Sequence, residues 1–156
     1  MGSRRMIQLT ADGKARLEAE HRELTDVDLP DLRKRIQDAS EEGDIDDNSE
    51  YEELKESYMQ AEARIRELEQ TLDRAEIIDE GSRDGTIGLG SHVTVRADDG
   101  FEETWILVAP EEASAIDLRF STQSPVGRAL IGHVANDSVS VEAPAGSITY
   151  TVVTVA

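Results

Sequence analysis

The sequence contains no cysteine among its 156 residues, which excludes disulfides and thiolate metal sites and suits a reducing cytosol. Aromatic residues make up only 4% of the chain, so the core must be mainly aliphatic. No apolar run approaches the roughly 20 residues that a membrane-spanning helix needs, and the N-terminus lacks the long apolar core of a signal peptide. These absences predict a cytoplasmic protein that does not bind a membrane.

Basic residues are also scarce, because 16 Lys and Arg stand against 34 Asp and Glu and leave a net charge of −18. Phosphate contacts need clustered Lys and Arg, so the composition argues against a free-standing nucleic-acid binder. Contact with nucleic acid could still occur through a local basic patch or within a larger complex. Basic partner surfaces, or cations, are the expected ligands.

The acid is concentrated between Ile36 and Leu54, where no Lys or Arg occurs. Crowded carboxylates repel one another, and folding alone does not compensate for that unfavourable energy. The sequence is helix-periodic on both sides, so we expect an acidic tip near residues 41–50 between two long helices. We expect this tip to carry the function. Its carboxylates are Asp38, Glu41, Glu42, Asp44, Asp46, Asp47, Glu50, Glu52 and Glu53.

The first helix is expected over residues 11–39, with Thr10 as its N-cap. Pro30 lies where the apolar spacing slips, and a proline inside a helix removes a backbone hydrogen bond. We therefore predict a kink or short break around residues 28–30. The apolar stripe consists of Leu17, Leu24, Val27, Leu32, Ile36 and Ala39.

The second helix has a cleaner pattern, in which apolar residues alternate at spacings of three and four over more than three heptads. Ser49 and Glu52 fit a capping box at its start, and the pattern changes after Ile78. Two such helices joined by a tight turn predict an antiparallel coiled-coil hairpin. The seam residues are Tyr51, Leu54, Tyr58, Ala61, Ile65, Leu68, Leu72 and Ala75.

The C-terminal half changes to a period of two, which is typical of strands. Residues 79–85 form a linker, residues 110–116 could hold a short helical turn, and residues 124–132 form a loop leading into a short helix. The chain is thus α+β, with a coiled-coil domain over 1–79 and a mainly antiparallel domain over 80–156. Strands are expected over 92–97, 101–108, 138–143 and 147–155.

Two segments together resemble one known family. Residues 43–51, GDIDDNSEY, resemble the signature G-D-x-x-E-N-x-E-Y, and residues 124–132, SPVGRALIG, resemble the element S-P-x-x-x-x-L-I/L-G. Both are typical of the GreA/GreB family of bacterial transcript-cleavage factors. The resemblance also includes residues 9–10 and 75–78, so it extends essentially from end to end. It implies an FKBP-like fold for the C-terminal domain.

The resemblance also implies a mechanism. The coiled coil would enter the secondary channel of bacterial RNA polymerase while the globular domain grips the channel rim. The tip would then help the polymerase's own active centre to hydrolyse the 3′ end of backtracked RNA. The acidic pair corresponds to Asp44 and Asp47, which would hold a Mg²⁺ ion within the polymerase complex; the family usually has Glu at the second place. Two carboxylates in water should bind Mg²⁺ only weakly, so the free protein should hold no stable cofactor and should not be an enzyme by itself.

Structural roles are the alternative for the same residues. Asp47 stands at a helix start and could be an N-cap, while Asp44 could only shape the turn. Asp46, Glu41 and Glu42 fit a solvated acidic rim. Tyr51 occupies the first seam position, which favours packing over stacking on an RNA base.

Two further sets of residues follow from the resemblance. Arg33, Lys34 and Arg35 form the densest basic cluster, and a basic patch on the coiled coil contacts the RNA 3′ portion in this family. Ion pairs with nearby acids are the alternative for these three. Ser124 and Pro125 belong to the loop that would bind the polymerase, although they could merely start a short helix.

Three functional hypotheses follow, and the tip separates them. A cleavage-stimulating elongation factor needs two specific carboxylates. An inhibitory homologue, which blocks the same channel without promoting cleavage, needs only abundant acid, and the extra Asp46 favours it. A coiled-coil adaptor or chaperone-like module needs neither. The three histidines, His21, His92 and His133, are far apart in the sequence and lack metal-ligand spacing.

Overall fold

The structure is a computed structural model that describes residues 5–42 and 49–156 of the chain. The fold separates into two compact units. One contains Ala15–Arg74, and the other contains the N-terminal residues through Lys14 together with Ala75–Ala156. The N-terminal strand and the first turn of the first helix therefore group with the sheet, which differs from a simple division at residue 79. In the described ranges, no helix is long and apolar enough to cross a membrane.

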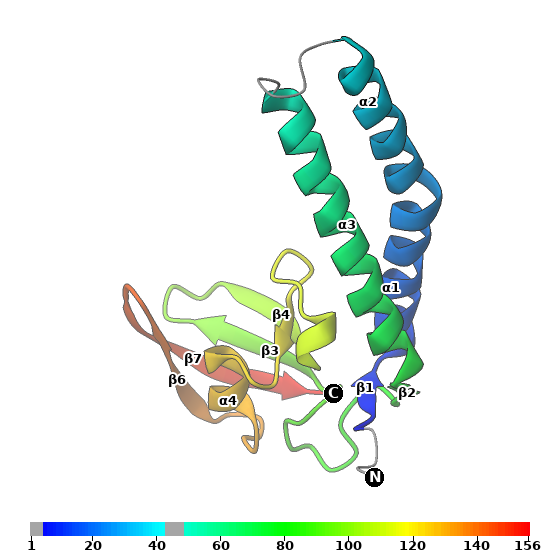
Figure 1. Ribbon diagram of the computed structural model, residues 1–156. Helices are drawn as coiled ribbons and strands as arrows, with labels where there is room; N and C mark the ends of the chain where they lie inside the picture. Colours follow the sequence, from blue (N-terminus) through cyan, green and yellow to red (C-terminus); the bar gives the residue numbers. More distant parts are fainter. Residues whose placement is uncertain (1–4, 43–48) are drawn as a thin grey trace. The chain divides into compact units, whose positions relative to one another are not determined.

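The helical unit is built from α1 (Ala11–Glu23), a π-helical turn η1 (Leu24–Asp28), α2 (Leu29–Glu42) and α3 (Ser49–Asp73). Figure 1 shows α2 and α3 running alongside each other in opposite directions. The long N-terminal helical region followed by a mostly antiparallel sheet confirms the predicted α+β class.

The first helix is interrupted by the π-helical turn at Leu24–Asp28, which begins four residues before the predicted break at 28–30. The backbone N–H of Leu29 donates to the carbonyl of Leu24, one residue further back than in an α-helix, and Pro30 follows directly. The extra residue rotates the apolar face. Leu29 is consequently 8% exposed and Val27 51% exposed, so the prediction that Val27 belongs to the buried stripe is wrong.

The seam of α3 follows the predicted spacing, because Leu54, Ala61 and Leu68 are all buried. The helix nevertheless ends at Asp73. Strand β2 (Ala75–Ile77) then pairs in parallel with β1 (Ile7–Leu9). The prediction that helix continues through Ala75 and on to Ile78 is therefore wrong, because the backbone of these residues bonds to the N-terminal strand rather than to the preceding helical turn.

An ion pair links α1 to α3 within the helical unit. The Arg64 guanidinium donates two hydrogen bonds, of 2.8 and 2.9 Å, to the carboxylate of Glu20. Hydrogen bonding to Glu20 raises the pKa of Arg64 above its ordinary value. Such bidentate pairs add geometric specificity to the attraction of opposite charges, so this contact ties α1 to α3.

The second unit contains a five-stranded sheet with the strand order β5-β4-β3-β7-β6. All neighbouring pairs are antiparallel except β4 with β5. The sequence pattern predicts four of these strands, but not the three-residue β5. The strands are β3 (His92–Ala97), β4 (Glu102–Val108), β5 (Arg119–Ser121), β6 (Ser138–Ala143) and β7 (Gly146–Val155).

The core of this unit lies on one face of the sheet, where the short helix α4 (Pro125–Leu130) contributes Leu130. A 3₁₀ turn, η3 (Pro110–Glu112), occupies the segment where a helical turn is expected. Trp105 packs against two further rings, with centroid separations of 5.0 Å to both Phe120 and Tyr150. The buried core residues are Ile87, Val93, Val95, Trp105, Leu107, Leu130, Val139 and Val152.

Candidate functional site

The predicted tip pair, Asp44 and Asp47, lies outside the described residues, as does Asp46. The structure describes the two helix ends that this segment connects: α2 ends at Glu42 and α3 begins at Ser49. The acidic segment is therefore the short connection between two long helices, as the sequence predicts. Among the residues that the structure describes, no group of three or more His, Cys, Asp or Glu could hold a metal ion.

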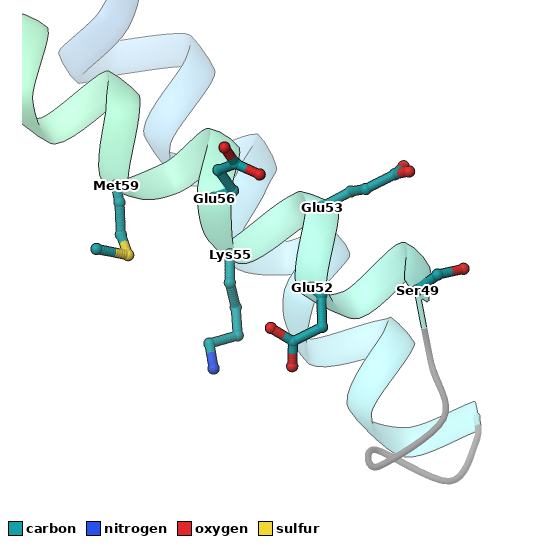
Figure 2. A pocket seen from close by; sticks show the side chains of 6 residues that line it. All are labelled: Ser49, Glu52, Glu53, Lys55, Glu56 and Met59. Carbon is teal, nitrogen blue, oxygen red and sulfur yellow. The ribbon is translucent and has the colours of Figure 1, made fainter.

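The first turns of α3 carry further carboxylates. A shallow hollow there is lined by one helix alone, and Figure 2 shows Glu52, Lys55 and Met59 projecting from the same side of it. Met59 is 67% exposed, so the hollow is open and its charges are hydrated. Its shape provides an acidic contact surface rather than an enclosed site. The lining residues are Ser49, Glu52, Glu53, Lys55, Glu56 and Met59.

Tyr51 lies in this first part of α3, where it begins the buried seam. Its side chain is half-buried, and the Lys55 ammonium lies 5.1 Å from the centre of its ring. A cation over the ring face is a favourable contact. The ring therefore has a contact within α3, and its role in packing stays a prediction.

The basic cluster on α2 divides into residues with different contacts. Arg33 donates from Nε to the Tyr58 hydroxyl at 3.1 Å and lies over the same ring at 5.8 Å, which ties α2 to α3. Arg35 lies 3.9 Å from the Asp31 carboxylate one turn earlier. Lys34 is exposed between them. The helix surface therefore presents all three cations, but Arg33 also has a packing role.

Ser124 and Pro125 start α4 in the manner that their residue types favour. The Ser124 hydroxyl accepts from the backbone N–H of Gly127 at 3.1 Å and donates to the Ser121 carbonyl at 2.7 Å. Pro125 is exposed at the first helical position. Gly127 is required because a Cβ at this position would lie 2.1 Å from the Ser121 carbonyl oxygen. This loop is therefore a rigid surface element, and its role in binding a polymerase stays a prediction.

The three histidines are surface residues, each with a carboxylate partner at 3.0 Å. His21 pairs with Glu69 in the helical unit, while His133 pairs with Asp137 after α4. The backbone N–H of Val134 is the main cause that lowers the pKa of Asp137, and His133 adds to it. The three pairs are separate surface contacts, of which His21–Glu69 joins α1 to α3.

A buried polar cluster joins the start of α1 to the sheet domain, and sequence reasoning missed it. The Glu112 carboxylate accepts from the Thr10 backbone N–H at 3.0 Å, from the Thr10 hydroxyl, and from Arg119 Nη1 at 2.6 Å. Arg119 also donates to Asp12 at 2.6 Å. The side chains of Glu112 and Arg119 are only 2% and 7% exposed. Thr10 and Glu112 are 102 positions apart, so no local pattern could have revealed the contact.

The geometry defines a class of protein: a two-unit α+β chain in which an acidic segment joins two long helices. Family comparison specifies the class. Residues 7–77 match the family described as transcription elongation factor, N-terminal, and residues 82–156 match transcription elongation factor, GreA/GreB, C-term. The chain belongs to the GreA/GreB family of transcription elongation factors.

Individual relatives resemble the chain over nearly its whole length. It is 46% identical over 149 residues to transcription elongation factor GreA of Chloroflexus aurantiacus, covering 94% of this chain and 95% of the relative. It is 38% identical to transcription elongation factor GreA of Thermotoga neapolitana, covering 96% of each. Among solved structures, the GreA factor homolog 1 (Gfh1) protein of Thermus thermophilus is 35% identical, covers 97% of this chain and 99% of its own, and has a TM-score of 0.46.

Proposed function

We propose that this chain enters the secondary channel of RNA polymerase and stimulates the polymerase's own cleavage of backtracked RNA 3′ ends. The observation that carries the proposal is the position of the acidic segment. It connects α2 and α3 in a chain that matches both family domains. A pair of long helices is a suitable support for this task, because groups delivered from helix ends lose little freedom when they act.

Asp44 and Asp47 are the residues that we assign to the reaction. Their carboxylate oxygens are the ligands that Mg²⁺ prefers, and such an ion is usually held by one or two carboxylates plus substrate phosphate. When bound beside the ion of the polymerase, Mg²⁺ would supply an activated water and stabilise the leaving oxygen. The role of this chain is to present two carboxylates close together. Their mutual repulsion is unfavourable in free water, and a bound cation would reduce it. The chain therefore acts only within the polymerase complex.

The remaining surfaces have supporting roles in this proposal. Arg33, Lys34 and Arg35 would contact the nascent RNA 3′ portion, with Lys34 and Arg35 offering exposed charge and Arg33 already bound to Tyr58. The rigid loop at Ser124 and Pro125 would dock on the polymerase at the channel rim.

An inhibitory role is the second candidate, and a sequence observation favours it. Asp47 stands where the family usually has Glu and is one methylene shorter, while Asp46 adds a third carboxylate. A tip with more charge and shorter reach would occupy the channel without completing the reaction.

The test is RNA cleavage in a defined backtracked elongation complex with Mg²⁺ present. Wild type should shorten the RNA rapidly from its 3′ end, whereas Asp44→Asn and Asp47→Asn should lose about 10²-fold or more in rate while still binding the polymerase. Asp47→Glu should keep or raise the rate. Glu53→Gln is the matched control, because it removes one exposed charge of α3 and should change the rate little. Tight binding with slower nucleotide addition and no cleavage would instead establish the inhibitor.

A further inference from the structure

A second candidate binding site lies in the sheet domain, at the end of the core face nearest the β3–β4 turn. A hollow of about 150 Å³ opens there. Since one water occupies about 30 Å³ of liquid, the hollow has room for a side-chain tip but not for a large ligand. Its lining residues are Val95, Ala97, Asp99, Phe101, Glu103 and Tyr150.

The strand register explains why these residues share one face. Val95 lies opposite Glu103 in the β3–β4 ladder, and Ala97 lies opposite Tyr150 in the β3–β7 ladder. Alternate residues of a strand point to the same face, so Glu103 follows Trp105 on the side that carries the core. The core therefore continues into the hollow: Val95 is 1% exposed at its inner end, and Phe101 is 62% exposed at its outer end.

Two carboxylates stand in this otherwise apolar and aromatic hollow, and local contacts fix both. One oxygen of Glu103 accepts from Trp105 Nε1 at 2.8 Å, which holds a half-buried charge against the sheet. Asp99 Oδ1 accepts from the Phe101 backbone N–H at 2.9 Å, which fixes the turn. The Tyr150 ring is held edge-on to Trp105 with a centroid separation of 5.0 Å. The two carboxylates and the Tyr150 ring are thus held by contacts within the sheet domain.

No basic residue is among the described residues that line the hollow. The neighbouring cation, Arg96, is paired with Glu102 on the opposite face, with hydrogen bonds of 2.8 and 2.9 Å. The negative charge of Glu103 and Asp99 is therefore not neutralised by the cation nearest in sequence. A ligand that enters the hollow meets carboxylates and aromatic side chains together.

We propose that this hollow binds a lysine or arginine side chain of a protein partner. Ring faces and carboxylates both attract cations, and the apolar base formed by Val95 and Ala97 suits the methylene stem that lysine and arginine carry. The net charge of −18 favours approach of a basic partner over an acidic one. An anionic ligand is disfavoured by the same charges. This site is separate from the acidic tip, so it does not depend on the proposed cleavage role.

The test is a titration of the isotopically labelled full chain followed by NMR of its backbone amides. The probe is a Gly-Lys-Gly tripeptide with both ends blocked, compared with the arginine analogue and with a norleucine analogue that keeps the stem but lacks the charge. The lysine or arginine peptide should give saturable shifts confined to residues around Ala97, Phe101, Glu103 and Tyr150. The norleucine peptide should not.

Two substitutions assign the binding to the hollow. Glu103→Gln keeps an acceptor for Trp105 but removes the charge, and Phe101→Leu keeps an exposed apolar side chain but removes the ring. Each should weaken binding by about two- to fivefold, while Glu142→Gln on exposed β6 should not change it. Equal binding of the norleucine peptide, or the absence of a saturable shift at these amides, would overturn the proposal.

Discussion

Glu112 is a charged residue whose side chain is almost completely buried. Its carboxylate is enclosed beside the first turn of α1, where Gly13 leaves room for it: a Cβ at position 13 would lie 2.0 Å from the Glu112 carboxyl carbon. Arg119 provides the compensating charge. A buried charge without its partner is strongly unfavourable, so the sheet domain should be destabilised when one of these two charges is removed and the other is left buried.

We predict that Arg119→Met destabilises the sheet domain by about 3–5 kcal/mol, since it leaves the Glu112 carboxylate buried without its cation. The measurement is urea unfolding followed by fluorescence of the single tryptophan, Trp105, which lies in the core of the same unit. Combining Arg119→Met with Glu112→Gln, which keeps an oxygen acceptor for Thr10 but removes the buried charge, should cost less than Arg119→Met alone.

The exposed pair Arg96–Glu102 is the matched control, because it joins an arginine to a glutamate in the same unit with side chains 49% and 44% exposed. Arg96→Met should cost no more than about 1 kcal/mol. If Arg96→Met and Arg119→Met shifted the urea midpoint equally, burial would not be what makes the Glu112 contact important.

Residue-level prediction succeeds where the signal is local. Thr10 is an N-cap as predicted, since its hydroxyl accepts from the Gly13 backbone N–H at 3.0 Å, and Ser124 caps α4 in the same way. The additional contacts of Thr10 with Glu112 could not be predicted, because they depend on a pairing across most of the chain. The tip residues Asp44 and Asp47 stay predictions from family resemblance.

At the scale of elements, the heptad pattern of α3 is the most informative feature of the sequence. It places Leu54, which is 6% exposed, in the buried seam, while Met59 lies on the outer side. The π-helical turn before α2 shows the limit of such patterns. Pro30 indicates that an irregularity lies nearby, but it does not predict a π-helical turn at Leu24–Asp28 that leaves Val27 exposed and Leu29 buried.

The sequence pattern does not predict the shortest strands, for a related reason. Strands β1, β2 and β5 have three residues each, which is too short for an alternating pattern to appear. They form because a distant segment offers a parallel partner, as β2 does for β1 and β4 does for β5. By contrast, β3 and β6 begin and end at the predicted residues, since each has an alternating run bounded by turn residues.

We predict that Leu54→Ala destabilises the helical unit by about 2–5 kcal/mol, because it removes a buried side chain and leaves a cavity in the seam. Met59→Ala, five residues later on the same helix, should change stability by no more than about 0.5 kcal/mol. Unfolding followed by the helical signal in far-ultraviolet circular dichroism measures both. Comparable losses in the two variants would show that the seam identified from the sequence does not hold the helices together.

For the whole molecule, the uneven distribution of charge has a consequence for stability. Nine carboxylates between Ile36 and Leu54 supply half of a net charge of −18, and their repulsion opposes the close approach of α2 and α3. Salt should reduce this repulsion, since raising the ionic strength from about 0.01 to about 0.1 M shortens the screening length from about 30 to about 10 Å.

We therefore predict that this increase in NaCl raises the Tm of the helical transition, by about 4–8 °C if about 1 kcal/mol of repulsion is relieved in a unit of about 60 residues. A variant in which four tip-proximal carboxylates become amides should start with a higher Tm and gain less from salt. A control with four neutralised carboxylates in the sheet domain should keep the full salt effect on the helical transition.

Equal salt gains in the two variants would show that the repulsion belongs to the whole chain rather than to the connection between α2 and α3. The tip variant carries Asp38→Asn, Glu41→Gln, Glu52→Gln and Glu53→Gln, and the control carries Asp84→Asn, Asp98→Asn, Glu111→Gln and Glu142→Gln.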